Sequence, residues 1–115
     1  MKLDTAIFYT NSVSQITSYY KDIIGLTIEV EQGEMYVSFL FENGVRLGIK
    51  KATDPRELVG AQTIIVEVNN IQEVYSRLKE KSITFYKELH EESWGTAFSI
   101  LDTDKNKVEF VERPK

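Results

Sequence analysis

The chain has no cysteine, only two prolines and only one histidine among its 115 residues. The absence of cysteine excludes a disulfide framework and any thiolate metal site. One histidine cannot supply the iron site of two histidines and one carboxylate from a single chain. No run approaches the roughly 20 apolar residues of a membrane-spanning helix, and no basic stripe is present. With a net charge of −4, we expect neither a membrane nor a nucleic acid as a partner.

The remaining composition is that of an ordinary globular protein, at 42% hydrophobic and 28% charged residues. Its length predicts one domain, residues 1–115, with a modest core. The first residues enter a strand pattern directly and lack the basic start and apolar run of a secretory signal. We therefore expect a cytoplasmic protein.

Residues 94–112 carry the clearest local pattern, two strands joined by a short polar turn. In the second strand polar and apolar side chains alternate, which is typical of a half-buried strand. Val108 and Phe110 point one way, whereas Lys107 and Glu109 point the other way. A mid-strand carboxylate that faces away from the main apolar layer indicates that Glu109 lines a cavity.

Two amphipathic helices are expected, over residues 13–23 and 71–78, from apolar residues at helical spacing. Asn11-Ser12 offers an N-cap for the first helix and Asn69-Asn70 for the second. Gly25 ends the first helix, since glycine adopts a left-handed conformation at least cost. The apolar residues of the two helices are Val13, Ile16, Tyr19, Tyr20, Ile23, Ile71, Val74, Tyr75 and Leu78.

Further strands are expected between the helices and turns. Asn43-Gly44 predicts a two-residue hairpin turn, because both residues tolerate positive φ. The segment 51–60 contains Pro55 and resembles a linker. The additional strands fall over residues 3–10, 26–31, 35–42, 45–50, 61–68 and 84–89.

The order of elements is βαβββ twice, and the two halves repeat one another. A shift of 58 (63 minus 5) pairs Thr5 with Thr63, and a later shift of 61 (109 minus 48) pairs Gly48 with Glu109. Such a repeat constrains the fold strongly. We predict an α+β fold, a curled mixed sheet formed by two tandem βαβββ modules. The modules span residues 1–51 and 61–113, and residues 52–60 join them.

Three short motifs accompany this repeat. SYYKDIIGL at the end of the first helix, Trp94-Gly95, and DTDKN at 102–106 occur in this order. Together they resemble the vicinal oxygen chelate superfamily, with its FY…LG, WG and D-P-D-G-N segments. Here Thr103 replaces the usual proline and Lys105 the usual glycine. Members include glyoxalase I, extradiol dioxygenases, fosfomycin-resistance enzymes and bleomycin-resistance proteins. The resemblance implies two incomplete barrels around a cup, and a homodimer.

Enzymes of this superfamily hold a divalent metal with side chains from four strand positions. The resemblance places these positions on Thr5, Gly48, Thr63 and Glu109, and only Glu109 matches the usual ligand type. Threonine hydroxyls are poor ligands for zinc or iron, and glycine has no side chain. The chain is therefore most similar to the metal-free, bleomycin-resistance-like branch, and we expect no metal and no other cofactor.

Strand parity predicts which side chains line the cup. Glu109 could instead pair with Arg46 or Lys107, as buried charges do. Trp94 is interpreted as a cover of the cup mouth, and His90, in an acidic run, as an exposed loop residue. The predicted ligand-binding residues are Thr5, Ile7, Tyr9, Arg46, Gly48, Thr63, Glu67, Trp94 and Glu109.

Three functions agree with these patterns. The first is a protein that binds a small aromatic or cationic molecule in an apolar cup without a metal, as in sequestration of an antibiotic or toxin. The alternative is a lyase or dioxygenase-type enzyme with Glu109 as general base or with unconventional metal ligands. The third is a protein-interaction module whose cup is filled by its own side chains. Whether the chain is an enzyme stays open at this point.

Overall fold

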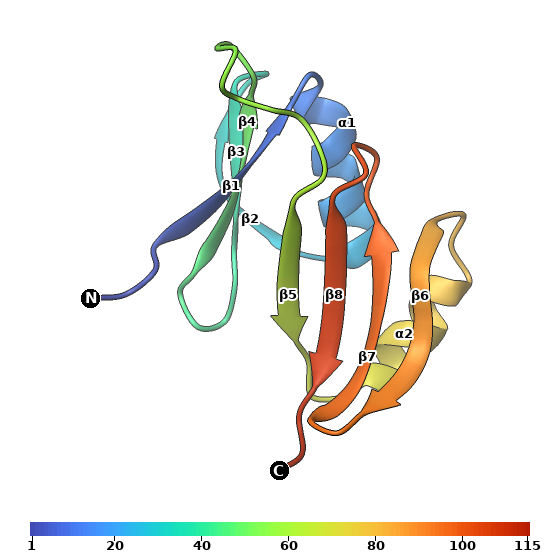
Figure 1. Cartoon of the computed structure of the whole chain (residues 1–115). Helices are drawn as coiled ribbons and strands as arrows, with labels where there is room; N and C mark the ends of the chain where they lie inside the picture. Colours follow the sequence, from blue (N-terminus) through green and yellow to red (C-terminus); the bar gives the residue numbers. More distant parts are fainter. The chain divides into compact units, whose positions relative to one another are not determined.

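The computed structural model describes residues 1–115, which divide into two compact units (Figure 1). The first unit is Met1–Gly60 and the second is Ala61–Lys115. The boundary therefore coincides with the end of the predicted linker. The assignment of the whole chain to a single domain stays a prediction. No helix is long and apolar enough to cross a membrane.

The first unit is a four-stranded sheet with a helical segment on one face. The strand order is β1-β4-β3-β2, with β1 parallel to β4 and the other neighbours antiparallel. The helix α1 contacts β3 and β4. In chain order the elements are β1 (Thr5–Thr10), α1 (Val13–Ser18), the π-helical segment η1 (Tyr19–Ile24), β2 (Thr27–Gln32), β3 (Tyr36–Leu40) and β4 (Arg46–Lys51).

The second unit repeats this arrangement. Its strand order is β5-β8-β7-β6, with β5 parallel to β8, and α2 contacts β7 and β8. The predicted α+β fold of two tandem βαβββ modules is confirmed, as two four-stranded mixed sheets. The elements are β5 (Thr63–Glu67), α2 (Ile71–Lys79), β6 (Thr84–Glu92), β7 (Gly95–Leu101) and β8 (Lys107–Glu112).

The strand registers agree with the repeat found in the sequence. In each sheet, three residues lie side by side in a row across three strands: the first strand of the unit, the last strand, and the strand that pairs antiparallel with the last one. Both shifts, 58 and 61, are reproduced by these rows. The rows are Ile7, Gly48 and Ser38 in the first sheet, and Ile65, Glu109 and Ser99 in the second.

The core of the first unit lies between the sheet and its helical segment. Tyr20 is fully buried, and its ring lies 6.3 Å from Phe8 and 6.0 Å from Phe39 between centroids. The Ser12 Oγ accepts a hydrogen bond from the Gln15 N–H, which confirms the predicted N-cap. At the other end Gly25 adopts a left-handed conformation with φ +92°, as predicted.

One detail of this helix differs from the prediction. Residues 19–24 form a π-helical segment, so the helix advances by a smaller angle per residue than an α-helix. The apolar stripe therefore moves by one position at its end. Ile24 is buried, whereas Ile23 is only half-buried.

The core of the second unit consists mainly of aromatic rings. Phe98 stacks on Phe110 at 5.0 Å, and Tyr75 from α2 meets Phe98 edge-on at 5.1 Å. The helix α2 begins after Asn70, but the predicted capping by Asn69-Asn70 is wrong, because the Asn70 side chain makes no cap hydrogen bond. The Glu112 carboxylate of β8 instead accepts the Ile71 N–H at 2.9 Å. This carboxylate joins the helix start to the last strand.

Two strand ends also differ from the prediction. Asn43-Gly44 does not form a two-residue hairpin, because only Gly44 has positive φ, at +86°. The loop is longer, and the Phe41 N–H donates to the Val45 carbonyl at 2.9 Å. The strand predicted over 84–89 continues to Glu92, with two register shifts along its pairing with β7.

Candidate functional site

Each sheet has one face that packs against its helix and one that does not. We call the second kind the helix-free face. These faces carry the side chains that strand parity predicts to line a cup. The first helix-free face consists of Thr5, Ile7, Tyr9, Tyr36, Ser38, Leu40, Arg46, Gly48 and Lys50. The second consists of Thr63, Ile65, Glu67, Ala97, Ser99, Leu101, Lys107, Glu109 and Val111.

The centre of the first helix-free face is filled by its own side chains. A Cβ atom at Gly48 would lie 2.6 Å from Ile7 Cδ1 and 2.7 Å from Tyr36 Oη. Both distances are shorter than van der Waals contact. Ile7 and Tyr36 therefore occupy the space into which a side chain at position 48 would project.

Arg46, at the edge of this face, is held by two acids. Its Nη2 donates to Glu29 Oε2 at 3.1 Å, and its Nη1 donates to Asp4 Oδ1 at 3.2 Å. The hydrogen bond and charge of Glu29, followed by the charge of Asp4, raise the pKa of Arg46 above its ordinary value. Glu29 of β2 and Asp4 of the N-terminal residues thus supply counter-ions to Arg46 within its own unit, and the alternative pairing with Glu109 of the second unit stays a prediction.

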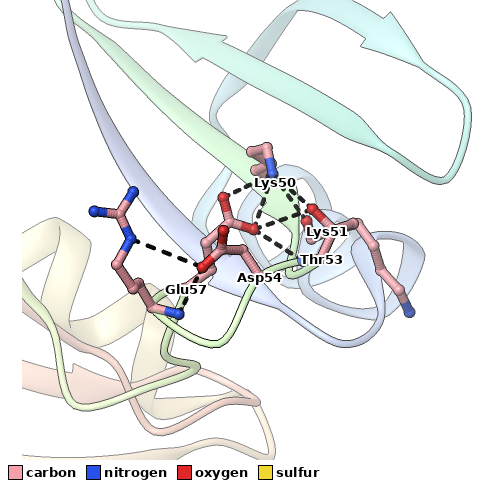
Figure 2. Close-up of polar contacts among 6 residues, drawn as sticks. Lys50, Lys51, Thr53, Asp54 and Glu57 are labelled. Atoms are coloured by element: carbon pink, nitrogen blue, oxygen red, sulfur yellow. Dashed lines mark hydrogen bonds and ion pairs between the residues drawn. The ribbon is translucent and has the colours of Figure 1, made fainter.

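Lys50 is also paired, as Figure 2 shows. Both Glu57 carboxylate oxygens lie 3.0 Å from Lys50 Nζ, and Glu57 Oε1 accepts the Thr53 N–H at 2.8 Å. The Thr53 N–H, followed by Lys50, lowers the pKa of Glu57 below its ordinary value. Lys50 Nζ also lies 5.6 Å from the centroid of the Tyr9 ring. Both cations of the first helix-free face therefore have counter-ions within their own unit.

The second helix-free face is open along β5, whereas Ala97, Ser99 and Val111 on its other strands are buried. Thr63, Ile65 and Glu67 of β5 are exposed, with Ile65 at 60%. Glu109 is half-buried in mid-strand, between Ile65 and Ser99. No ion pair forms between Glu109 and Lys107, so the pairing considered for this carboxylate within its own unit does not occur.

A depression of about 260 Å³ lies at the end of this face, where β5 and β8 begin and β7 ends. Lys107 Nζ lies above the Tyr86 ring, 4.8 Å from its centroid. Thr63 is the only predicted ligand-binding residue in the lining, and strand parity alone did not single out Tyr86. The lining residues are Ala61, Gln62, Thr63, Tyr86, Leu101, Lys105 and Lys107.

Trp94 lies at the opposite end of β7 from this depression. The Arg113 guanidinium lies 5.4 Å from the centroid of its ring, so Trp94 contacts the C-terminal segment. The adjacent Gly95 has φ +149°, and a Cβ there would lie 2.3 Å from the Glu112 carbonyl oxygen. The Trp-Gly motif therefore marks a close approach of two backbones.

His90 lies within β6, so its prediction as a loop residue is wrong. Its Nδ1 lies 2.9 Å from the Glu88 carbonyl oxygen, and its Nε2 lies 3.3 Å from Glu92 Oε1. The acidic run continues the strand, and the ring contacts its own neighbours in that strand.

The four positions implied by the superfamily can be tested against a metal. Thr5, Gly48, Thr63 and Glu109 together supply one carboxylate and two hydroxyls, and the space over Gly48 is filled. No group of three or more histidine, cysteine, aspartate or glutamate residues is placed to hold an ion. This donor set does not fit a zinc or iron site.

The comparisons with known proteins agree on the fold. A family model described as a glyoxalase-like domain matches residues 3–113. The structure of TnmS3, an antibiotic binding protein from Streptomyces sp. CB03234, has a TM-score of 0.84 and 12% identity, and the match covers 99% of this chain and 97% of that one. TioX from Micromonospora sp. ML1 has a TM-score of 0.81 and 12% identity, with coverage of 99% and 100%.

A lyase has the same fold. Lactoylglutathione lyase from Agrobacterium tumefaciens has a TM-score of 0.82 and 17% identity, and the match covers 96% of this chain and 92% of that one. No curated protein sequence matches the chain. At these identities the structural likeness shows a shared fold and leaves the choice between binding and catalysis to the residues of the site.

Proposed function

Because the chain belongs to the glyoxalase-like domain family, we propose that it binds a small organic molecule without a metal ion. The observation that carries this proposal is the space over Gly48. Ile7 and Tyr36 approach that position so closely that the carboxylate usual there could not be added without displacing both side chains. Glu109 is then the only remaining ligand of the usual type.

The biological role that fits best is sequestration of an antibiotic or toxin. Binding of this kind needs shape and a few polar contacts, and it needs no reacting group. TnmS3, which has this fold, is an antibiotic binding protein. The β5 side of the second helix-free face, with exposed Ile65 beside half-buried Glu109, is the part of the predicted site that is accessible to a ligand.

Two measurements test this proposal. Protein made without a histidine tag, from cells supplied with zinc, nickel, iron and manganese, should contain far less than one metal ion per chain by elemental analysis. A thermal-shift screen of aromatic antibiotics should yield a ligand that raises the Tm. A ligand at 100 times its Kd stabilises the folded state by about 2.7 kcal/mol. One tightly bound metal per chain, or no ligand up to millimolar concentration, would contradict the proposal.

Catalysis by Glu109 is a second candidate, favoured by one observation. This carboxylate is half-buried and makes no ion pair with Lys107, so its oxygens are available to accept a proton from a substrate within hydrogen-bond reach. If a substrate is found, Glu109→Gln should abolish turnover and leave the urea unfolding midpoint nearly unchanged. Glu73→Gln, at an exposed glutamate of α2 outside both helix-free faces, is the matched control. Unchanged turnover in Glu109→Gln would remove this residue from the mechanism.

The homodimer and the cytoplasmic location stay predictions, as does the absence of membrane and nucleic-acid partners. Several large apolar side chains are exposed, among them Leu3 at 64% and Leu58 at 69%. Such side chains favour a partner surface when they form one patch. Light scattering after size-exclusion chromatography should give twice the chain mass of 13.3 kDa. A mass of one chain at micromolar concentration would refute the dimer.

A further inference from the structure

We infer that the depression at the start of β5 and β8 is a subsite for a small aromatic carboxylate, held by Lys105 and Lys107. The inference rests on the proposed function and names the chemical class of its ligand. It keeps the aromatic ring of the aromatic or cationic molecule expected from the sequence, but replaces the cationic alternative with an anion. Four independent features of the depression support it.

The first feature is its charge. Arg46 and Lys50, on the first helix-free face, are both paired with carboxylates. Lys105 and Lys107 line the depression without any ion pair, and no acid is among the lining residues. The chain as a whole has a net charge of −4. A local excess of two positive charges on such a chain favours an anion as the missing counter-ion.

The acids of the adjoining turn do not fill this role. One Asp102 carboxylate oxygen accepts the N–H groups of Asp104 and Asn106, and the other accepts the Asn106 amide at 3.0 Å. The Asp102 side chain is thus turned into the loop. Asp104 is not among the lining residues.

The second feature is an aromatic surface. Tyr86 is 62% exposed, which is high for a large ring, and it faces the same depression as Leu101. Lys107 Nζ already lies 4.8 Å from the Tyr86 centroid. A flat ring can pack on Tyr86 and Leu101 while its carboxylate meets the ammonium. The volume of about 260 Å³ suits one substituted ring, since drug-sized ligands need more.

The third feature is backbone strain. Ala61 with φ +62° and Lys105 with φ +67° are the only non-glycine residues with positive φ in the chain, and both line the depression. Strained residues of this kind gather at ligand sites, where the surrounding structure maintains them. The superfamily motif has glycine at position 105, which would relieve the strain. A lysine here is explained if its ammonium has a function.

The fourth feature is the rigidity of the rim. The Gln62 N–H donates to Asn106 Oδ1 at 3.1 Å, and the Lys107 N–H donates to the Gln62 carbonyl at 2.8 Å. Asn106 is fully buried. The two segments that carry the lysines and the threonine are therefore fixed to each other before a ligand arrives, which reduces the entropy lost on binding.

The test uses three probes with the same ring and different charge: benzoate, benzamide and benzamidinium. Each is titrated into the full chain labelled with ¹⁵N, and amide shifts of residues 61–63 and 105–107 are followed. Trp94 fluorescence is unsuitable, because this residue lies at the far end of β7. Benzoate should bind with a Kd of about 1–10 mM, as expected for a fragment of this size, and more weakly at high salt.

Three variants assign the charge. Lys107→Gln and Lys105→Asn should each weaken benzoate binding roughly tenfold, the effect of one charge-assisted hydrogen bond. Asparagine is chosen at 105 because it tolerates positive φ. Lys81→Gln, an exposed lysine of the same unit, should leave the Kd unchanged. Spectra of the free variants show whether each is folded.

Two outcomes overturn the inference. Benzamide or benzamidinium that binds as tightly as benzoate, with both lysine variants unaffected, would show that the depression does not select anions. No shift with benzoate up to 20 mM in the folded chain would show that it is no subsite. Either result leaves the proposed function intact if the antibiotic screen finds a ligand, so the two ideas fail separately.

Discussion

Replacing Gly95 by alanine tests a close approach between the start of β7 and the end of β8. The added Cβ would lie 2.3 Å from the Glu112 carbonyl oxygen and 3.2 Å from the Arg113 Cα. Both atoms belong to the backbone of β8 and its continuation, so no side-chain rotation can relieve the clash. The φ of +149° adds a second cost, because L-residues rarely adopt it.

The expected loss of stability follows from these two terms. Holding a non-glycine residue in such a region costs about 1–3 kcal/mol. Moving β8 away also weakens the pairing of Thr96 with Glu112, and a hydrogen bond contributes about 1 kcal/mol. The sum, about 2–4 kcal/mol, is a large part of the 5–15 kcal/mol typical of a domain. At about 4 °C per kcal/mol the Tm should fall by roughly 8–16 °C.

Urea unfolding followed by circular dichroism measures this loss. Gly44→Ala is the matched control, because Gly44 has φ +86° and a Cβ there meets nothing within 4 Å. It should cost only about 1 kcal/mol, the strain of a left-handed residue. Equal losses in the two variants would refute the reasoning, since only Gly95 has the steric term.

Three further predictions concern other positions. Hydrogen bonds from Tyr75 and Lys79 lower the pKa of the Glu88 carboxyl below its ordinary value of 4.5. The stability that this carboxylate contributes is present above pH 4.5 and is lost as the pH falls through the lowered pKa. In urea unfolding, the free energy of unfolding of wild type should therefore exceed that of Glu88→Gln at neutral pH, and the difference should disappear below about pH 4.5. Asn106→Ala removes a fully buried side chain that accepts the Gln62 N–H and donates to the Asp102 carboxylate, and the free energy of unfolding in urea should fall by about 2–3 kcal/mol. Gly48→Glu should lower it by about 1–3 kcal/mol through overpacking, whereas an unchanged urea midpoint would show that the space is free.

The features that the sequence predicted correctly are local or periodic. The Ser12 cap and the left-handed Gly25 depend on residues within one turn, and the chemistry of those residue types is restrictive. The orientation of Glu109 depends on strand alternation, which has a period of two and continues along the strand. The repeat of the two units depends on many such signals at once, so single exceptions do not obscure it.

The features that it missed depend on partners distant in the chain. The cap of α2 comes from Glu112, 41 residues after Ile71, and Arg46 finds Glu29 on a strand that it does not adjoin. The chain has many acidic residues, and the sequence alone does not show which of them pairs with Arg46. The π-helical segment at 19–24 keeps an apolar pattern close to that of an α-helix, so its extra residue per turn leaves little signal in the sequence.

The contrast between the two helix-free faces depends on one exchange of side-chain size. In register, Gly48 of the first unit corresponds to Glu109 of the second, and Tyr36 corresponds to Ala97. The first unit therefore combines a missing side chain with a phenol that lies over the gap, and the second combines a carboxylate with a methyl group. Each pair keeps the summed volume similar, as close packing requires. The filling of the first face over Gly48 and the carboxylate at the corresponding position of the second face are thus two sides of one exchange, and the second face is exposed along β5, where Ile65 is 60% exposed.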